Sequence, residues 1–381
     1  MNPRSVGVEE ELLLVEPGTG QPRAVAGTVL RQVRQAAESS RAAGAHGAGA
    51  DQARDDAASL GLELQEQQLE TNSQPCHSLS DLHREVRRCR AVAAAAAGKA
   101  GAQVAALATS PVAVEPELVS ESRYQRMSEA FGLTAHEQLT CGCHVHVEIS
   151  SDDEGVAVLD RAGPWLAILL ALSANSPFWQ GNDSSYASFR YQAWGRWPNS
   201  GPTEPFQTAR RYHETLQQMV RTGTLLDAGM VYFDARLSER YPTIEIRVAD
   251  VCLQAEDAVL IAALARALVE TEARGWRQGT PVRQVRAELL RLAAWRASRS
   301  GLDDVLIHPL SGLPAPSAAV AALLLEHVSD ALADAGETGT VTDLLAAVMA
   351  RGNGAAFQRN AYRRSDHLAD VVSSAVEATT R

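Results

Sequence analysis

The segment Thr140–Ser150 (TCGCHVHVEIS) constrains the fold most, because apolar and polar side chains alternate along it without a break. Successive side chains of a β-strand point to opposite faces. The cysteines, valines and isoleucine would therefore cover one face, and His144, His146 and Glu148 would lie on the other. A helix would scatter both sets around its circumference. The pattern predicts a strand with one face on a core and one face that presents two imidazoles and a carboxylate.

Three further segments carry acidic or paired charges in apolar surroundings. In Val6–Val15 (VGVEEELLLV), strand alternation separates Glu9 and Glu11 from Glu10, which falls among apolar residues. Leu62–Asn72 (LELQEQQLETN) is compatible with a strand or a helix, and Thr243–Asp250 (TIEIRVAD) alternates as a strand. Each segment also fits an exposed amphipathic surface. The charged pairs expected on a shared face are Glu9 with Glu11, Glu66 with Glu70, and Glu245 with Arg247.

These polar faces, if they share one sheet, bring at least five carboxylates together. Two carboxylates about 4 Å apart repel by roughly 4 kcal/mol at an effective dielectric of about 20, so a sheltered cluster requires cations. Carboxylate oxygens favour Mg²⁺ or Mn²⁺, the ions that accompany nucleotide phosphates. Neither common phosphate-binding glycine motif is present. The His-x-His pair also occurs in zinc and iron sites and on ordinary sheet surfaces, so those interpretations stay open.

Composition narrows the class of protein. The chain has 381 residues, 45% of them hydrophobic, which is typical of a globular protein. The net charge of −11 argues against general binding to nucleic acids. Five cysteines suggest reduced thiols in the cytoplasm. The start of the chain shows no apolar signal region, and the longest apolar run, Trp165–Ala174, is about half of the ~20 residues that a membrane span needs.

No linker clearly divides the chain, so we expect a single catalytic domain over residues 1–381 with a mostly helical C-terminal third over 256–381. Before that third, we expect a helix over Thr28–Ala43 and a loop over Ala42–Ala58. We also expect a helix capped by Ser80 that runs to about Ala106, a helix that begins near Pro164, and a strand over Met230–Arg236.

The ordered motifs of the chain resemble those of the carboxylate–amine ligases of the glutamate–cysteine ligase type 2 family. The resemblance covers nearly the whole chain. The matching pieces are Gly7–Leu12, Glu66-x-x-x-Glu70-Thr71, Arg123-Tyr124, Gly142–Val147, Leu170–Gly181 (LALSANSPFWQG), Ser188–Arg190, Thr243–Asp250, Trp295–Ala297 with Arg299 and Gly301, and Gly354 with Gln358-Arg359.

The resemblance implies an α+β, glutamine-synthetase-like fold. Its curved, mainly antiparallel sheet would hold the active site on the concave face, with helices outside. It also implies that ATP phosphorylates a carboxylate to give an acyl phosphate, which an amine then attacks. The pair assigned to the family is L-glutamate with L-cysteine, giving γ-glutamylcysteine. Activity in this subgroup is expected to be weak, so another acid or amine stays open. A homodimer is compatible with the family, and no nucleic-acid or membrane partner is implied.

The resemblance also implies roles for individual residues. Arg247 would neutralise the transferred phosphoryl group beside Glu245, and the fixed fork of arginine suits phosphate. Arg190 would clamp a substrate carboxylate, and Arg299 would contact the nucleotide. The residues implied as ligands of two or more Mg²⁺ (or Mn²⁺) ions are Glu9, Glu11, Glu66, Glu70, His144 and Glu245.

Two departures from the family pattern affect the substrate pocket more than the proposed metal ligands. Ala293 and Ala294 stand where members often have asparagine, and Ala108–Pro111 replaces a Gly-Thr-His-Pro variant. Three other functions stay open. One is an amide ligase of the same fold with a different acid or amine. Another is a His-x-His metal hydrolase or oxygenase, which would leave the acids of the other strands unexplained. The third is a non-catalytic binding protein.

Overall fold

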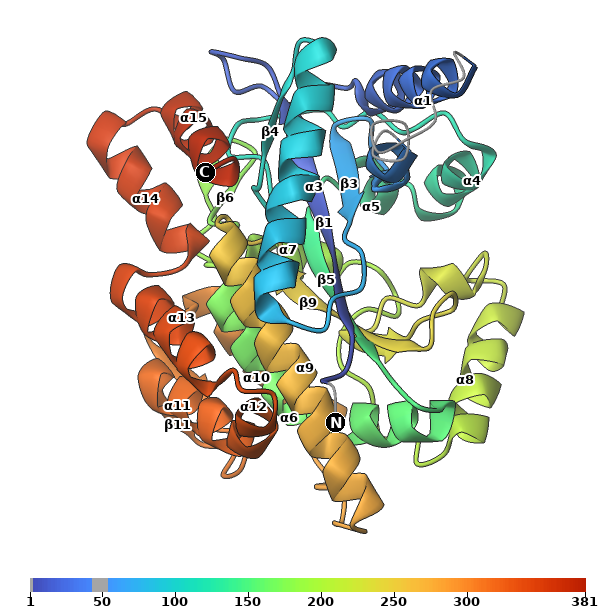
Figure 1. Cartoon of the computed structure of the whole chain (residues 1–381), viewed down its shortest axis with the longest axis vertical. Coiled ribbons are helices and arrows are strands. Elements are labelled where there is room, and N and C mark those ends of the chain that lie inside the picture. Colours follow the sequence, from blue (N-terminus) through green and yellow to red (C-terminus); the bar gives the residue numbers. More distant parts are fainter. Residues whose placement is uncertain (1–2, 43–53) are drawn as a thin grey trace.

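The computed structural model describes residues 3–42 and 54–381, and an antiparallel sheet runs through its centre (Figure 1). The strand order is β2-β3-β1-β5-β9-β8, and β4 pairs with the far end of β1. The strands are β1 (Val6–Val15), β2 (Leu60–Leu62), β3 (Gln68–Asn72), β4 (Gln103–Ala105), β5 (Gly142–Glu148), β8 (Ala235–Leu237) and β9 (Thr243–Asp250). This confirms the predicted mainly antiparallel sheet.

Helices surround this sheet and make up most of the C-terminal third (Figure 1). They are α1 (Ala26–Ala42), α3 (Leu79–Lys99), α4 (Ser122–Phe131), α5 (Leu133–His136), α6 (Asp152–Ser173), α7 (Phe189–Trp194), α8 (Ala209–Arg221), the 3-10 turn η1 (Ala228–Met230), α9 (Ala255–Arg277), α10 (Ala287–Ser300), α11 (Ser317–His327), α12 (Ser329–Asp334), α13 (Thr338–Arg351), α14 (Gly354–Ser365) and α15 (Leu368–Thr379). Two short hairpins complete the fold: β6 (Phe178–Trp179) with β7 (Asn182–Asp183), and β10 (Val305–Ile307) with β11 (Pro314–Pro316).

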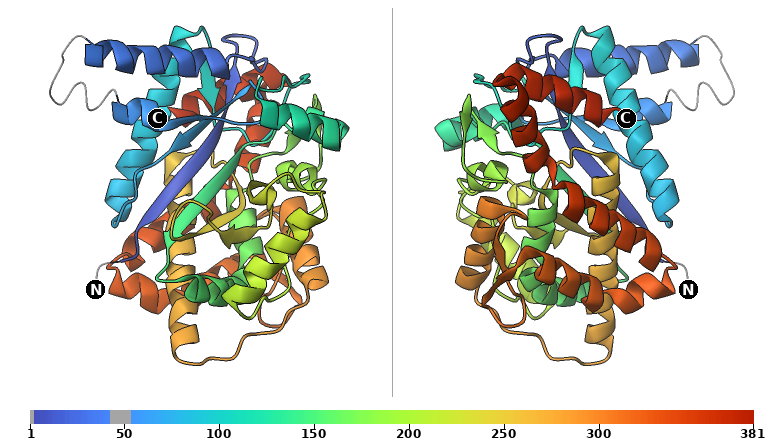
Figure 2. Two further views of the ribbon diagram at one scale, coloured as in Figure 1. Left: turned by 90° about the vertical axis from the view of Figure 1, so that its right-hand side faces the viewer. Right: turned by 90° about the vertical axis from the view of Figure 1, so that its left-hand side faces the viewer.

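One face of the sheet forms the main core, as the alternation predicts. Val8 of β1, Val145 of β5 and Ile246 of β9 are fully buried in one cluster with residues of α3, α6 and α9. Figure 1 shows α3 and α9 lying across the sheet, and the turned views in Figure 2 show β1 and β5 side by side along its length. The long helices α3, α6 and α9 pack on this face, and the opposite face carries polar side chains.

The pairing of β5 with β9 contains a bulge. Cys143 lies opposite Ala249, but Val145 lies opposite Ile246, so β9 carries one more residue than β5 in this interval. A bulge bends the strand and changes where the side chains beyond it point. Val248 and Ala249 are therefore both buried. The bulge sits beside the histidine strand, where it affects the shape of the polar face.

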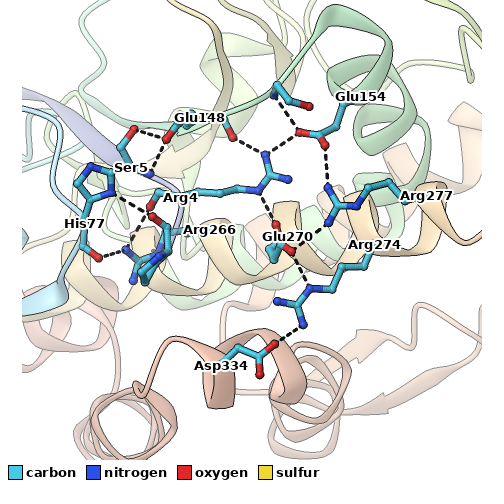
Figure 3. A network of polar contacts seen from close by, with 12 residues as sticks. Arg4, Ser5, His77, Glu148, Glu154, Arg266, Glu270, Arg274, Arg277 and Asp334 are labelled. Carbon is cyan, nitrogen blue, oxygen red and sulfur yellow. Dashed lines mark hydrogen bonds and ion pairs between the residues drawn. The ribbon is translucent and has the colours of Figure 1, made fainter. Parts of the chain in front are cut away.

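Polar contacts fasten the start of β1 to the end of β5 and to two helices (Figure 3). Arg4 donates to the carboxylates of Glu154 and Glu270 at 2.7 Å each, and to the carbonyl of Glu148 at 2.7 Å. The backbone N–H and hydroxyl of Ser5 both donate to Glu148 at 3.0 Å. Glu154 lies in the first turn of α6 and Glu270 in α9. These contacts help to fix the register of β1 against β5.

Several boundaries differ from the expectations. Helix α3 is capped by Ser78 and not by Ser80, because the Ser78 hydroxyl accepts a hydrogen bond from the N–H of Asp81. The helix ends at Lys99 and not near Ala106. Helix α6 begins twelve residues before Pro164, at Asp152, where the Ser151 hydroxyl accepts from Glu154. Among the described residues, α6 is the one helix long and apolar enough to span a membrane. Because 72% of its apolar window is buried in the protein, the core accounts for that composition.

Other predicted segments are divided differently. The expected strand over Met230–Arg236 is a 3-10 turn followed by β8. Residues 54–58 of the expected loop are helical, and 43–53 lie outside the described residues. The segment Leu62–Asn72 is neither one strand nor one helix, because a turn closed by a hydrogen bond from the N–H of Gln68 to the carbonyl of Gln65 interrupts it.

Candidate active site

A cavity of about 740 Å³ lies over the polar face of the sheet. Strands β1, β2, β3, β5, β8 and β9 supply its floor, and α4 with the segment around Asp227 supplies part of its wall. The residues from the polar strand faces that line it are Glu9, Glu11, Glu63, Glu70, His144, His146, Arg236, Glu245 and Arg247. The predicted convergence of acidic side chains on one sheet face is therefore present.

Three adjacent strands place two histidines and two glutamates at the centre of this cavity. Glu9 of β1 is in register with His144 of β5, and His146 is in register with Glu245 of β9. One Glu9 oxygen is 3.3 Å from His146 Nε2, and the other is 3.6 Å from His144 Nδ1. Glu9, His146 and Glu245 each offer a donor atom within 4.8 Å of the others, which is a spacing that one metal ion could bridge.

The electrostatics of this group follow from its contacts. Burial acts to raise the pKa of Glu9, but the two histidines outweigh it and hold that pKa below its ordinary value. Burial lowers the pKa of His144, and the nearby charge of Arg247 lowers it further. For His146, burial acts to lower the pKa, but the contact with Glu9 raises it above its ordinary value. Glu9 is therefore an ionised ligand candidate and His144 a neutral one.

A second acidic group lies beside the first, on β1, β3 and the segment after β2. Glu11 accepts a hydrogen bond from the N–H of Gly142 at 2.6 Å, and Glu70 accepts one from Asn72 at 2.8 Å. Burial raises the pKa of Glu63 well above its ordinary value, and the charges of Glu11 and Glu70 add to that effect. Burial, and then the charge of Glu9, raise the pKa of Glu70 to about 7. These carboxylates repel one another in the absence of a cation.

Two arginines hold Glu245 in place. Arg236 donates from Nε to one Glu245 oxygen at 2.6 Å and is itself bonded to the carbonyls of Gly229 and Val231. Arg247 bonds the other Glu245 oxygen through Nη1. Burial acts to raise the pKa of Glu245, but the charges of Arg247 and Arg236 outweigh it and lower that pKa. The arginine side of the cavity is therefore charge-balanced, whereas the side of the second acidic group is not.

The residues present fit divalent cations. Five carboxylates line the cavity from the sheet strands and the segment after β2, and two of the arginines that line it, Arg236 and Arg247, lie on the same sheet. Within the part of the chain that the structure describes, the Nε2 atom of His144 is buried without a hydrogen-bond partner. Buried polar atoms are rarely left unpaired in folded proteins. Hard cations bound by oxygens and one imidazole would resolve both the repulsion and the unpaired nitrogen.

Three of the predicted site residues lie away from this cavity. The carboxylate of Glu66 accepts from the N–H of Gly27 at 2.8 Å and so binds the first turn of α1. Arg190 is 2% exposed and does not line this cavity, although its guanidinium lies on the His144 face of β5, where a Cβ on Gly142 would be 2.3 Å from it. Arg299 lies over the ring of Tyr186. The structure does not bring these three side chains into the site as it stands.

Two residues that the sequence analysis missed line the cavity. Glu63 shares the segment LELQEQQLE with Glu66 and Glu70, and only the turn between β2 and β3 determines that Glu63, not Glu66, points inward. Arg236 stands opposite Glu245 in the β8–β9 pairing. An arginine in a short strand next to a charged strand is only a weak sign in the sequence that it pairs with a glutamate of the site. His146, which was not among the predicted ligands, lies nearer to Glu9 than His144 does.

Behind the cavity, Asp234 should give the fold a pH dependence that Asp234→Asn removes. Burial raises the pKa of Asp234 to about 7, while the Tyr191 hydroxyl at 3.0 Å and the charges of Arg190 and Arg291 oppose that rise. Between the ordinary pKa of aspartate, about 4, and about 7, only the unfolded chain releases this proton. Stability should therefore fall as pH rises through that window.

The expected loss from Asp234 between pH 4 and 7 is on the order of 2–4 kcal/mol. Asparagine keeps an oxygen for the Tyr191 hydroxyl but does not ionise. Urea unfolding of both proteins at pH 5, 6, 7 and 8 measures the difference, since other titrating groups are common to both. A gap between the two proteins that does not change with pH would contradict the prediction.

Comparison with protein families and curated proteins identifies close relatives. The family model described as "Glutamate-cysteine ligase family 2(GCS2)" matches residues 5–374. A Streptomyces avermitilis protein named "Putative glutamate--cysteine ligase 2-1" is 52% identical over 376 residues, which cover 99% of this chain and 99% of that protein. A Streptomyces coelicolor protein named "Putative glutamate--cysteine ligase 2" is 51% identical with the same coverage.

Solved structures share the fold at low sequence identity. A bifunctional glutathione synthetase from Pasteurella multocida has a TM-score of 0.67 and 16% identity, and the match covers 99% of this chain and 53% of that one. A glutamate–cysteine ligase from Francisella tularensis in complex with AMP has a TM-score of 0.63 and 12% identity, covering 100% and 89%. These likenesses establish the fold. The family match along nearly the whole chain and the relatives of about 50% identity show that the protein belongs to glutamate–cysteine ligase family 2.

Proposed function

We propose that the protein is an ATP-dependent carboxylate–amine ligase. The observation that carries this proposal is the convergence of five carboxylates, two histidines and Arg247 in one cavity over the sheet. In the proposed reaction, a substrate carboxylate oxygen attacks the γ-phosphorus of ATP, the bond to the β-phosphate oxygen breaks, ADP leaves, and an acyl phosphate forms. The amine then forms a C–N bond to the acyl carbon, the C–O bond to phosphate breaks, and phosphate and a proton are released.

The acidic side chains would bind metal ions, and Arg247 would neutralise the transferred phosphoryl group. Mg²⁺ or Mn²⁺, when bound, would shield the charge of the triphosphate, which is the main requirement of phosphoryl transfer. The residues proposed to hold these ions are Glu9, Glu11, Glu63, Glu70, His144 and Glu245, with His146 beside them. Arg247 would face the transferred group, because its guanidinium is fixed by Glu245 and is the only arginine of β9 in the cavity floor among the described residues.

For the substrates, we propose L-glutamate as the acid and L-cysteine as an amine that is used weakly. The names of the relatives support this pair. Arg190 would act as a positioning residue, because its guanidinium packs against Gly142 and close to His144. A role for Arg299 in nucleotide binding would require movement of its side chain, which now lies over Tyr186.

We further propose that residues 1–381 act as one catalytic domain in the cytoplasm. In support, α9 of the C-terminal third is buried against the same core face as β1, β5 and β9. All five cysteines are free thiols, and all are buried. ATP is available in that compartment, and buried thiols persist there in reduced form.

The test is phosphate release from ATP with Mg²⁺ and L-glutamate, measured with and without L-cysteine. We expect release that depends on the amine and that falls to background in Glu245→Gln, because glutamine cannot supply the charge that faces the cations and arginines. Removal of divalent ions with EDTA should abolish release, and added Mg²⁺ should restore it.

A matched pair of variants tests whether the cavity is the site. Glu70→Gln removes a carboxylate from the cavity and should reduce release at least about tenfold, whereas Glu66→Gln alters only the contact with α1 and should retain it. Equal effects of the two changes would contradict the assignment. Absence of phosphate release with every acid and amine tried would reject the ligase proposal, and a tightly held zinc ion in that protein would favour the His-x-His hydrolase.

A further inference from the structure

A second cavity lies behind Trp194, outside the acidic cavity that the proposed function uses. It encloses about 400 Å³, and apolar surface dominates its wall. This volume falls in the range of roughly 300–1,000 Å³ that is typical of small-molecule sites. Its wall includes Tyr191, Trp194, Arg291, Leu292 and Trp295.

Trp194 is the partition between the two cavities. This residue lines both of them. The guanidinium carbons of Arg190 and Arg247 each lie 5.8 Å from the centre of its ring system. A molecule in the second cavity would therefore contact the same tryptophan against which Arg247 lies in the acidic cavity.

The mouth of the second cavity carries exposed apolar side chains. Leu292 is 61% exposed and Trp295 is 41% exposed, and both lie on α10. Apolar side chains gathered on a surface often mark a binding site. Arg291 stands beside them and forms no hydrogen bond or ion pair within residues 3–42 and 54–381. An apolar wall with one available guanidinium suits a molecule that is apolar at one end and anionic at another.

We infer that this second cavity binds the acceptor amine of the ligation, and that the acceptor is an α-amino acid with a bulky apolar or aromatic side chain. Its side chain would pack on Leu292 and Trp295, its carboxylate would pair with Arg291, and its amino group would pass the edge of Trp194. L-Cysteine would leave most of the apolar wall unfilled. The inference rests on the proposed ligase function and specifies the class of its second substrate.

Kinetics with three acceptors test the assignment at fixed ATP, Mg²⁺ and L-glutamate. We expect kcat/KM for L-phenylalanine to exceed that for L-cysteine by about tenfold or more. Leu292→Ala should raise the KM for L-phenylalanine severalfold without changing the KM for ATP. The matched control is Leu289→Ala, which is on the same helix, 56% exposed and outside the cavity wall, and should behave as the wild type. Arg291→Ala should weaken the binding of L-phenylalanine. It should not weaken the binding of 2-phenylethylamine, which lacks the carboxylate.

Binding without turnover separates this inference from the ligase proposal. Trp194 and Trp295 line the cavity, so L-phenylalanine titrated without ATP should change tryptophan fluorescence in the wild type and in Glu245→Gln, but not in Leu292→Ala. If the fluorescence changes but no acceptor supports turnover, the second cavity binds the amino acid and the ligase proposal fails. If L-cysteine supports turnover while L-phenylalanine neither binds nor reacts, or if Leu292→Ala matches Leu289→Ala, the inference is overturned and the ligase proposal stands.

Discussion

Replacing Arg247 with lysine is expected to lower kcat for ATP-dependent amide formation by about 10²–10³-fold, the usual cost of losing a preorganised group that stabilises charge in the transition state. Burial acts to lower the pKa of Arg247, but the charges of Glu245 and Glu11 outweigh it and raise that pKa, so the guanidinium stays charged. It is fixed by a hydrogen bond to Glu245 and lies over Trp194. Lysine keeps the charge but loses the planar fork that matches phosphate oxygens.

The KM for ATP should change little in Arg247→Lys, because an interaction made mainly in the transition state affects kcat and kcat/KM together. The matched variant is Arg236→Lys. Arg236 also pairs with Glu245, but its other donors are occupied by the carbonyls of Gly229 and Val231, so we expect a smaller loss of about tenfold. Initial rates of phosphate release and a thermal unfolding curve for each variant provide the measurement. A folded Arg247→Lys protein with a kcat within about threefold of wild type would reject this role.

Alternation along the strands made much of the site predictable. The strand Gly142–Glu148 was recognisable because cysteine and valine occupy every second position, and burial of Cys143, Val145 and Val147 confirms that face. The same logic placed Glu9 and Glu11 on one side of β1. The period of two is a local property, so a single segment suffices to reveal it. Pairing in register then brings His144 against Glu9.

What the sequence could not reveal depends on backbone geometry between segments. In LELQEQQLE the sequence predicts that Glu66 shares a face with Glu70, but the short turn after β2 turns Glu63 into the cavity and Glu66 toward α1. The bulge in β9 likewise leaves no clear signal in the sequence. Val248 and Ala249 are both apolar, so the alternation does not show where the extra residue lies. The motif predicts that Arg190 clamps a substrate carboxylate, but only tertiary packing determines that its guanidinium lies against Gly142 beside His144.

The sequence pattern predicts which face of β1 carries Glu10, but it does not predict the partner of Glu10. Strand alternation separates it from Glu9 and Glu11 and predicts that it lies on the apolar face of β1. The structure confirms this, since Glu10 is 1% exposed. Its partner is Arg90 of α3, eighty residues away, which donates to its two oxygens at 2.6 and 2.9 Å. No pattern near Glu10 could identify that partner, although a buried carboxylate must have one. Of the three consecutive acids, two therefore line the cavity and the third is part of a buried ion pair.

Replacing Arg90 with methionine is expected to lower the free energy of unfolding by about 3–5 kcal/mol, because it leaves the Glu10 carboxylate buried without a counter-charge. Arg90 also donates to the carbonyls of Cys252 and Leu253, which would lose these bonds. The double variant Glu10→Leu with Arg90→Met removes both charges. It should recover at least about 2 kcal/mol of the loss, since replacing a buried ion pair by apolar side chains is much less costly than breaking it.

A matched control on the same helix makes this prediction specific. Arg84 of α3 pairs with Asp81, and their side chains are 74% and 49% exposed. Arg84→Met should therefore cost at most about 1 kcal/mol. Urea unfolding at pH 7 for the wild type, both single variants of α3 and the double variant gives the four free energies. Equal losses for Arg90→Met and Arg84→Met would show that Glu10 does not depend on Arg90. A double variant no more stable than Arg90→Met would show that the carbonyl contacts, not the charge pair, account for the role of Arg90.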